Sequence, residues 1–248
     1  MARETGAAFP SALQIKAIAA LDDDLRRGLY EFGRRAGRPV TRDEAAAAVG
    51  ISRKLAAFHL DKLVAAGLLR AHYEPVGGIR RVGRTPKVYE PTGDGIHVAI
   101  PARHHEVLAE ILIDAVMTEG AGESARAAAM RVAAARGEDL GSRERARYRP
   151  GRLGAERALT LAEEALTPYG FEPARSTPTC VHLRNCPFHP LAAHAPDLVC
   201  GINHSFLTGF VTGLQAHTVH AVLAPTDGQC CVHLTADPPA EHVGGTSA

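Results

Sequence analysis

Apolar residues near the start of the chain recur at three- and four-residue steps, which is the spacing of one face of an α-helix. The stripe begins at Leu13 and reaches Phe32, and three consecutive aspartates at 22–24 interrupt it. Asp22 has a side chain suited to cap a second helix, which would end at Gly37. This stretch therefore predicts two consecutive helices.

A pair of shorter helices is predicted next. Thr41 precedes Glu44 by three residues, the spacing of a capping box, and the short helix that they open stops at Gly50. Ser52 then caps a helix that ends at Gly67. Two short helices joined by a tight turn are typical of a helix-turn-helix, in which the start of the second helix enters the DNA major groove.

A β-hairpin with a basic tip follows these helices. LLRAHYEPV and KVYEPT have the pattern of its strands, and the glycine- and arginine-rich GGIRRVGRTPK connects them. Cations at a hairpin tip beside a helix-turn-helix are suited to contact phosphates, whereas the alternative for any basic run is an ordinary solvated surface. The candidate DNA contacts are Ser52, Arg53, Lys54, Ala57, Phe58, His59, Arg80, Arg81, Arg84 and Lys87.

The same residues resemble a known class of DNA-binding proteins. SRKLAAFHLDKLVAAGLL followed by GRTPKVYEPT is similar to the recognition helix and wing of ArsR-like winged-helix regulators, whose wing often reads GRPxxxY. The match departs by one inserted residue, because Thr85 precedes Pro86. The resemblance covers roughly residues 15–95 and implies a winged helix-turn-helix domain, which we place at 13–95.

Two helical stretches are predicted in the middle of the chain, after a connection at 93–101. HHEVLAEILIDAVM is amphipathic, with apolar side chains from Val107 to Val116 on one face, which either pairs two copies of the chain or packs within its own chain. The next stretch predicts a helix up to Gly137, then a charged loop. We assign 102–150 to a helical linker or dimerisation region. A basic run begins in this region, and such runs are most often solvated faces. It comprises Arg143, Arg145, Arg147, Arg149 and Arg152.

Strands flank a helix in the last third of the chain, after a helix that ends near Pro168. FEPARST and CVHLR are predicted strands, LAAHAPDLVCGINHSFLTGFVTGL is a predicted helix, and HAVLAPT and CCVHLTA are predicted to form a hairpin. This arrangement is an α+β module. We therefore expect an α+β protein in which a cysteine-bearing sensor domain over 151–237 follows the other two regions.

The overall charge conceals an uneven distribution. The 248 residues hold 28 Lys and Arg against 27 Asp and Glu, but residues 1–100 hold 16 basic and 11 acidic side chains, and residues 101–248 hold 12 and 16. With 46% apolar residues the chain can bury a core, which excludes a disordered tail. The start of the chain lacks a signal-peptide pattern and no run approaches the roughly 18 apolar residues of a membrane span, so we expect a cytoplasmic protein without a membrane partner.

All five cysteines lie in the acidic part of the chain. In a reducing compartment such thiols indicate metal or redox chemistry more than a disulfide framework, although their spacing is not that of a zinc ribbon. Cys186 in the turn NCPFHP, Cys200 on the next helix and the adjacent Cys230 and Cys231 on the closing strand fall where they can converge. Because neighbours on a strand face opposite sides, only one of the adjacent pair is expected to reach the site.

Three thiolates suit an iron–sulfur cluster, and zinc would accept the same donors together with His189. A winged helix followed by CPFH, a cysteine about fourteen residues on and another some thirty residues later resembles SufR-type regulators, which bind a [4Fe–4S] cluster and repress genes of iron–sulfur cluster assembly. The resemblance implies that Cys186 and Cys200 are the first two ligands and that Cys230 or Cys231 is the third.

Other interpretations stay open. Cys180 has no counterpart in that pattern, and cysteines in general can be core fillers without a metal. Gly209 and Gly213 in the predicted helix leave room for an apolar pocket that takes a small ligand. No nucleophile elbow, P-loop, dinucleotide-binding fingerprint or HExxH motif occurs, so we do not expect an enzyme.

The expected function is that of a homodimeric regulator that binds a double-stranded DNA operator. We expect a repressor that an iron–sulfur cluster switches, with genes of cluster assembly as its targets. The alternative is a zinc-containing or metal-free winged-helix regulator that a small ligand switches.

Overall fold

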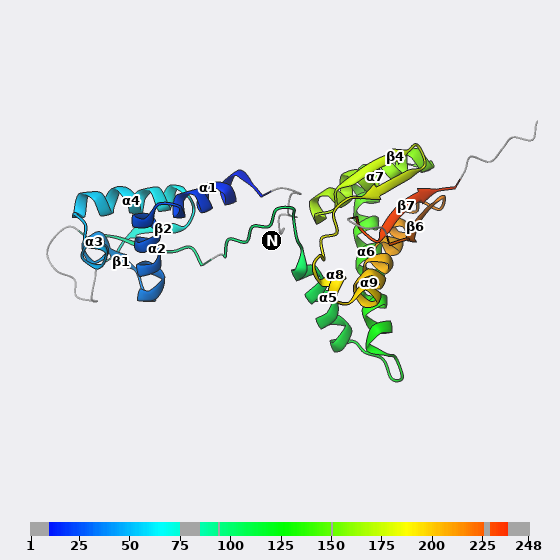
Figure 1. Ribbon diagram of the computed structural model, residues 1–248, viewed down its shortest axis with the longest axis horizontal. Helices are drawn as coiled ribbons and strands as arrows, with labels where there is room; N and C mark the ends of the chain where they lie inside the picture. Colours follow the sequence, from blue (N-terminus) through cyan, green and yellow to red (C-terminus); the bar gives the residue numbers. More distant parts are fainter. Residues whose placement is uncertain (1–9, 75–84, 94, 150, 226–228, 238–248) are drawn as a thin grey trace, which may run out of the picture. The chain divides into compact units, whose positions relative to one another are not determined.

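The computed structural model describes residues 10–74, 85–93, 95–149, 151–225 and 229–237 (Figure 1). The chain forms two compact units, one over Pro10–Val98 and the other from Ala99 onward, and each unit has a hydrophobic core of its own. Helices and small antiparallel sheets build both units, so the protein is α+β as predicted. No helix in these ranges is long and apolar enough to cross a membrane.

The N-terminal unit packs its helices against a sheet with the strand order β1-β3-β2. Tyr89 on the central strand pairs with Val40 on one side and Ala71 on the other. Leu29, Leu60 and their neighbours form the core beneath. The elements are α1 (Ala12–Leu21), α2 (Asp24–Ala36), β1 (Val40–Thr41), α3 (Arg42–Val49), α4 (Arg53–Ala65), β2 (Leu69–Tyr73) and β3 (Lys87–Pro91).

Local signals for the helix ends in this unit are confirmed. Thr41 and Glu44 form the reciprocal capping box at the start of α3, and the Ser52 hydroxyl accepts a hydrogen bond from a backbone amide in the first turn of α4. Gly37 and Gly50 follow α2 and α3 in the left-handed backbone conformation that favours glycine. These caps fix where α3 ends and α4 begins.

One predicted cap shifts by a residue. Asp23, rather than Asp22, caps α2 by accepting a hydrogen bond from the Arg26 amide at 2.9 Å. The predicted strands on either side of the basic hairpin tip are present as β2 and β3. The tip lies outside the described residues, and with it Arg80, Arg81 and Arg84.

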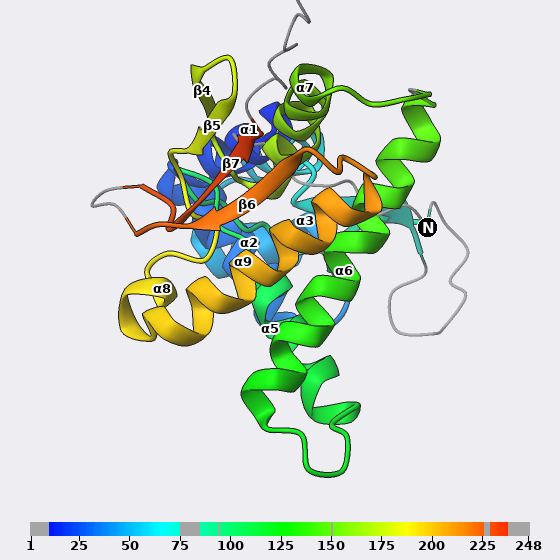
Figure 2. The ribbon, with the colours of Figure 1, turned by 90° about the vertical axis from the view of Figure 1, so that its right-hand side faces the viewer.

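The C-terminal unit packs helices against a sheet with the strand order β4-β5-β7-β6 (Figure 2). Alternate residues of the inner strands are buried, Val181 and Leu183 on β5 and Val232 and Leu234 on β7, so one face of the sheet lies on the core. The elements are α5 (His105–Met117), α6 (Ala125–Tyr148), α7 (Ala155–Leu166), the 3₁₀-helix η1 (Thr167–Tyr169), β4 (Pro173–Thr177), β5 (Cys180–Leu183), α8 (Leu191–His194), α9 (Pro196–Gly213), β6 (Val219–Leu223) and β7 (Val232–Ala236).

The long helices α6 and α9 cross with their backbones in direct contact (Figure 2). Gly137 and Gly141 on α6 meet Gly209 and Gly213 on α9, and a Cβ atom at any of these positions would overlap a backbone carbonyl oxygen of the other helix. The prediction that the helix ends at Gly137 is therefore wrong. That glycine lies inside α6 because the crossing needs a residue without a side chain.

The same crossing corrects a second expectation. Gly209 and Gly213 face α6 and are not among the lining residues of the pocket described below. The helix predicted over 191–214 is divided into α8 and α9 at Ala195. Pro196 accounts for the break, because its ring disfavours helical backbone in the preceding residue and is well placed to open a new helix.

The helices expected to form a separate region over 102–150 share the core of the C-terminal unit. Leu108 and Ile111 on α5 and Leu140 on α6 belong to the same buried cluster as the sheet residues. The predicted apolar face of α5 thus packs within its own chain. Val116 is an exception, because it is 71% exposed and lies beside the exposed Met117.

The basic run after Gly137 is the last two turns of α6 and the residues that follow. Arg143 pairs with Asp139 at 3.1 Å on the same helix, and Arg145 donates to the carbonyl oxygen of Leu214 at 3.1 Å. Arg143 is exposed, as expected of a solvated face. Arg145 differs, because it is half-buried and bonded to the residue that follows α9.

Candidate functional site

Four of the five cysteines come together at one edge of the C-terminal core. Cys186 lies in the loop between β5 and α8, which we name the cysteine loop (residues 185–190). Cys200 lies on α9, and Cys230 and Cys231 directly precede β7. The first two are partly buried against the core and the last two are 5% and 7% exposed. Three separate segments of the chain therefore supply the thiols.

The expectation that only one of the adjacent cysteines reaches this site is wrong. It assumed that both lie on a strand, but β7 begins at Val232, and Cys231 lies in a bend before it. Strand alternation does not apply to a bend. Cys230 interacts with Cys186, whereas Cys231 interacts with Cys200, so both thiols take part.

The thiols form a chain of hydrogen-bonded neighbours, in the order Cys186, Cys230, Cys231 and Cys200. Hydrogen bonding from Cys230 lowers the pKa of Cys186 below its usual value, despite burial, and lowers that of Cys231 to about 6. The same hydrogen bonds, together with burial, raise the pKa of Cys230. Burial and the neighbouring Cys231 raise the pKa of Cys200 to about 12. Lowered and raised pKa values thus alternate from Cys186 through Cys230 and Cys231 to Cys200.

Backbone amides of the cysteine loop also favour the Cys186 thiolate. The amides of Phe188 and His189 contribute to the lowered pKa of Cys186, and the His189 amide also donates to the Cys186 carbonyl oxygen at 3.1 Å. The His189 imidazole itself is on an exposed residue. His189, the candidate zinc ligand, therefore contributes to the site through its backbone amide.

Asn203 is a member of the site that sequence analysis did not find. Its side chain is fully buried, and its amide nitrogen donates to the sulfur of Cys230 at 3.0 Å. It also hydrogen-bonds to Cys231 and contributes to the lowered pKa of that thiol. The amide oxygen has no partner among the described residues. Its position three residues after Cys200 was an available signal, because that spacing places both on one face of a helix.

The arrangement does not resemble a site for a single metal ion. Within the described ranges, no group of three or more His, Cys, Asp and Glu side chains is placed to hold one. Cys180 takes no part in the thiol chain that these residues form, since it lies on β5 in register with Thr235. It remains a partly buried thiol on a strand.

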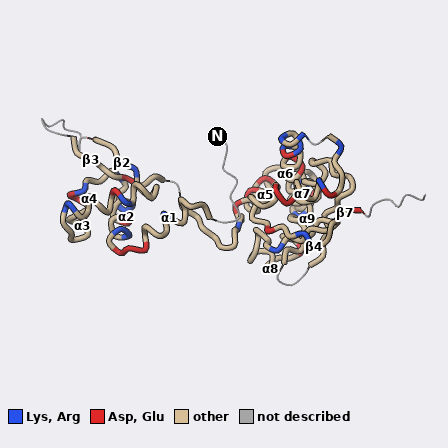
Figure 3. The backbone as a smooth tube through the Cα atoms, turned by 90° about the horizontal axis from the view of Figure 1, so that it is seen from above, with Lys and Arg blue, Asp and Glu red and all other residues tan. Residues whose placement is uncertain are grey.

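The start of α4 presents a mixed basic and apolar surface in the N-terminal unit. Ser52, Arg53 and Lys54 are exposed, Phe58 is 54% exposed, and Ala57 lies half-buried between them. Lys and Arg positions on α2 and α4 are coloured blue in Figure 3. Five of the predicted DNA contacts therefore lie on an accessible helix surface.

Two other predicted DNA contacts are placed differently. His59 is 7% exposed, so it packs in the unit instead of facing outward, and its Nδ1 atom has no partner in the described part of the chain. Lys87 is the first residue of β3 and not part of the hairpin tip. Its ammonium donates to the Asp61 carboxylate on α4 at 2.7 Å, and the Tyr89 hydroxyl donates to the same oxygen at 3.1 Å. These bonds join the strand to the helix.

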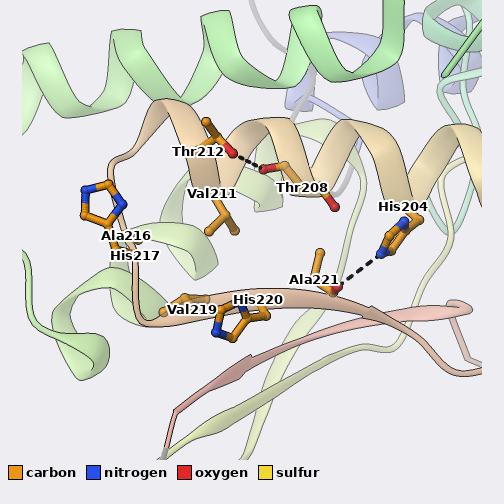
Figure 4. Close-up of a pocket in the computed structure, with 9 residues that line it drawn as sticks. All are labelled: His204, Thr208, Val211, Thr212, Ala216, His217, Val219, His220 and Ala221. Carbon is orange, nitrogen blue, oxygen red and sulfur yellow. Dashed lines mark hydrogen bonds between the residues drawn. The ribbon is translucent and has the colours of Figure 1, made fainter. Parts of the chain in front are cut away.

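A pocket of about 330 Å³ lies between the second half of α9 and β6 (Figure 4). Its polar lining includes His204, whose Nε2 atom lies 3.1 Å from the Ala221 carbonyl oxygen, and Thr208 one turn further along α9. Thr212, His217 and His220 complete the polar lining. The pocket does not include any of the cysteines.

Sequence analysis also missed a pair of residues at the start of the cysteine loop. Asn185, the first residue of the loop, is buried, and Arg103, 82 positions earlier in the chain, donates to its amide oxygen. No local pattern marks this pair, because the signal for it exists only in the fold.

We compared the chain with protein families, with curated proteins and with solved structures, and none of the three comparisons found a match.

Proposed function

We propose that this protein is a DNA-binding transcriptional regulator that is switched by an iron–sulfur cluster. The observation that carries the proposal is the meeting of Cys186, Cys200, Cys230 and Cys231 from a loop, a helix and a hairpin. Core-filling cysteines have no reason to gather from three segments. A shared ligand is the simplest physical reason for this arrangement.

The donor set suits an iron–sulfur cluster by its chemistry, since soft thiolates are the ligands that such clusters take. Among the described residues, no group of His, Cys, Asp and Glu side chains is placed to hold a single metal ion. A [4Fe–4S] cluster is a larger body that takes one thiolate at each iron, so its four ligands surround it without meeting at a point. The four cysteines would hold it, so that both Cys230 and Cys231 would serve as ligands together with Cys186 and Cys200. The cluster would supply sensitivity to oxidants and to iron supply.

The N-terminal unit supports the DNA-binding half of the proposal. We interpret α3, the turn at 50–52 and α4 as a helix-turn-helix, and β2 and β3 as the strands of a wing. The exposed Arg53 and Lys54 lie in the first turn of α4, which enters the major groove in this class. Arg53 is partly neutralised by Asp43 at 3.5 Å. We therefore assign Lys54 the larger part in reading base edges.

A metal-free regulator that a small ligand switches is the second candidate. The pocket between α9 and β6 is the observation in its favour, because ligand sites are concave and mix apolar walls with a few polar groups. Homodimerisation through the exposed apolar end of α5 belongs to either version of the proposal. Both versions assign a binding role to the protein and not a catalytic one.

Anaerobic purification tests the proposed cofactor. We expect a brown protein that contains iron and acid-labile sulfide, with both lost in Cys186→Ser and Cys231→Ser. Cys180→Ser is the matched control and should keep both, since this thiol lies outside the site. A colourless protein without iron or sulfide would refute the cluster and leave the small-ligand version.

The DNA-binding part of the proposal is tested with duplex DNA that is selected from a random pool by repeated rounds of binding. Lys54→Ala should weaken binding to the selected sequence at least about fivefold, the usual cost of losing a base contact. Arg157→Ala, on the exposed surface of α7, is the control and should bind as the unmodified protein does. Failure to enrich any sequence would contradict a regulator of this kind.

A further inference from the structure

The first residues of the C-terminal unit are hydrogen-bonded to the cysteine loop. We name these residues, 99–105, the connector segment. The backbone amide of His104 donates to the carbonyl oxygen of Pro187 at 2.9 Å. The Nε2 atom of His105 lies 3.0 Å from the carbonyl oxygen of His189. The two segments are about 80 residues apart in sequence, so these are tertiary contacts.

Arg103 and Asn185 form the centre of this contact. The Arg103 guanidinium donates to the Asn185 amide oxygen and to the Cys186 carbonyl oxygen, the latter at 3.4 Å. The Asn185 amide nitrogen donates back to the carbonyl oxygens of Ala102, at 3.0 Å, and Gly170, at 2.6 Å. Asn185 is 6% exposed, so both ends of its amide are satisfied where water has little access. Removing either partner leaves a buried polar group unpaired, which is costly.

The connector segment has a particular place in the chain. The N-terminal unit ends at Val98, and the connector segment follows immediately. The bonds that hold the cysteine loop therefore also hold the chain from Ala102 on, four residues after it leaves the N-terminal unit. A change in the backbone of the cysteine loop acts on these residues.

We propose that Arg103 and Asn185 are positioning residues that couple the cysteine site to the N-terminal unit. Cys186 joins both networks, because its sulfur lies in the thiol chain and its carbonyl oxygen accepts from Arg103. When a ligand holds the Cys186 sulfur, the loop is fixed and the connector segment is anchored. When the sulfur is released, these bonds exchange with water, and the N-terminal unit gains orientations that DNA binding must remove. The inference rests on the proposed function, of which it is the transmission step.

Hydrogen exchange at the His104 amide reports the anchor directly, because that amide donates to the cysteine loop. We expect removal of the cluster to speed its exchange about tenfold or more, which corresponds to losing one buried hydrogen bond of about 1.4 kcal/mol. In Arg103→Met the exchange should already be fast with the cluster bound. The ratio of DNA affinities between the cluster-bound and cluster-free forms should fall towards one, while iron per chain stays the same.

Arg126→Met is the matched control. Its guanidinium donates to the Asp197 carbonyl oxygen at 3.0 Å, so it also joins an arginine to a distant backbone oxygen of this unit, but away from the connector segment. This variant should keep the ratio of the unmodified protein. Arg103→Lys retains a cationic donor and should therefore recover part of the ratio of DNA affinities that Arg103→Met loses. A purely structural role of Arg103 would not require this recovery.

The outcomes separate the inference from the proposed function. An Arg103→Met protein with normal iron, normal His104 protection and an unchanged affinity ratio would overturn the coupling. If the unmodified protein holds no iron, the proposed function fails instead. The coupling is then tested by comparing His104 exchange in the unmodified protein and in Cys186→Ser, which needs neither iron nor DNA, and equal rates in the two would overturn it.

Discussion

Asn203 is a buried amide of which only the donor half is used. Its nitrogen donates to Cys230 and to Cys231, while its oxygen is unpaired among the described residues. A donor to sulfur favours thiolate over thiol, as second-sphere donors do around metal sites. The residue therefore tunes the thiols whether or not they hold a ligand.

Replacing Asn203 by Leu, which has a similar volume and no polar group, should raise the pKa of Cys231 from about 6. In iron-free protein, thiolate absorbance at 240 nm should then appear at higher pH than in the unmodified protein. Cys180→Ser is the control and should leave the titration of the site in place. An unchanged midpoint in Asn203→Leu would contradict the role assigned to the amide.

Glu44 gives a pH-dependent test in the other unit. Arg38, whose guanidinium donates at 2.7 Å, and the Thr41 amide at 2.8 Å hold the pKa of this carboxylate at about 2. Because the folded-state pKa is lowered, the stabilisation is complete above the ordinary value of 4.5 and is lost as the pH falls towards 2. Glu44→Gln keeps an acceptor for the cap and removes the charge.

We expect Glu44→Gln to lower the free energy of unfolding by roughly 1 kcal/mol at pH 7, since solvent screens this partly exposed pair. The difference should shrink between pH 5 and pH 2, as measured by chemical denaturation. Glu31→Gln, whose carboxylate lies 3.9 Å from Arg35 on exposed α2, should change stability by less than about 0.5 kcal/mol at pH 7. A constant difference across that pH range would contradict the role of the Glu44 charge.

At the scale of single residues, local signals were sufficient where the interaction is local. Thr41, Glu44 and Ser52 cap the helices that the sequence predicts, because each cap joins residues three apart. Asn203 and Arg103 were not predicted. Their partners lie 27 and 82 positions away, and only the fold brings them together.

Among the helices and strands, the crossing of α6 and α9 determines the shape of the C-terminal core. Its two pairs of glycines allow backbone contact, so the helices approach more closely than side chains permit. α9 carries Cys200 and Asn203 on the same helix as this crossing. The position of the thiol site therefore depends on a contact made two to three turns away.

Gly209→Ala should unfold or strongly destabilise the C-terminal unit, because the added methyl would meet the carbonyl oxygen of Ala134. Overpacking of this kind costs about 1–3 kcal/mol or more. Gly33→Ala on α2 is the matched control, because no atom lies within 4 Å of the added methyl. It should stabilise its unit by about 0.5–1 kcal/mol through helix propensity. Similar effects of the two changes, measured by thermal unfolding, would contradict the packing argument.

The sequence predicted most helices and strands, and two of the junctions that it misjudged share a physical reason. Gly137 was taken as a helix end because glycine commonly ends helices. Instead, the backbone of α9 lies so close to this position that only glycine fits there, inside α6. Cys230 and Cys231 were placed on a strand because CCVHLTA was taken as one arm of a hairpin, but pairing with the adjacent strand begins only at Val232. Both errors concern contacts with distant segments, which a local pattern does not contain.

On the scale of the whole molecule, the two cores are separate. Leu60 belongs to the N-terminal core and Phe210 to the C-terminal one. The predicted connection at 93–101 contains the boundary between Val98 and Ala99, and the split of charge and thiols along the chain follows it. The composition along the sequence was sufficient to predict this division. It did not predict the bonds that anchor the connector segment.

Two cores predict two unfolding transitions in calorimetry. Leu60→Ala should lower the transition temperature of the N-terminal unit only, and Phe210→Ala that of the C-terminal unit only. Each change should reduce the free energy of unfolding of its unit by about 2–5 kcal/mol. Each variant is the other's control. A single transition that both variants shift equally would show that the units unfold together.

The spread of the thiols along the chain also sets an order of events during synthesis. The ribosome delivers residues 10–98 first, and N-terminal units generally fold before the rest of a chain is complete. Cys230 and Cys231 emerge some 130 residues after that unit is complete. A chain interrupted between the two units would therefore carry a folded N-terminal unit without the four thiols. A ligand that needs all four thiols can bind only after Cys231 has been made, so a loaded site reports that the N-terminal unit is already complete.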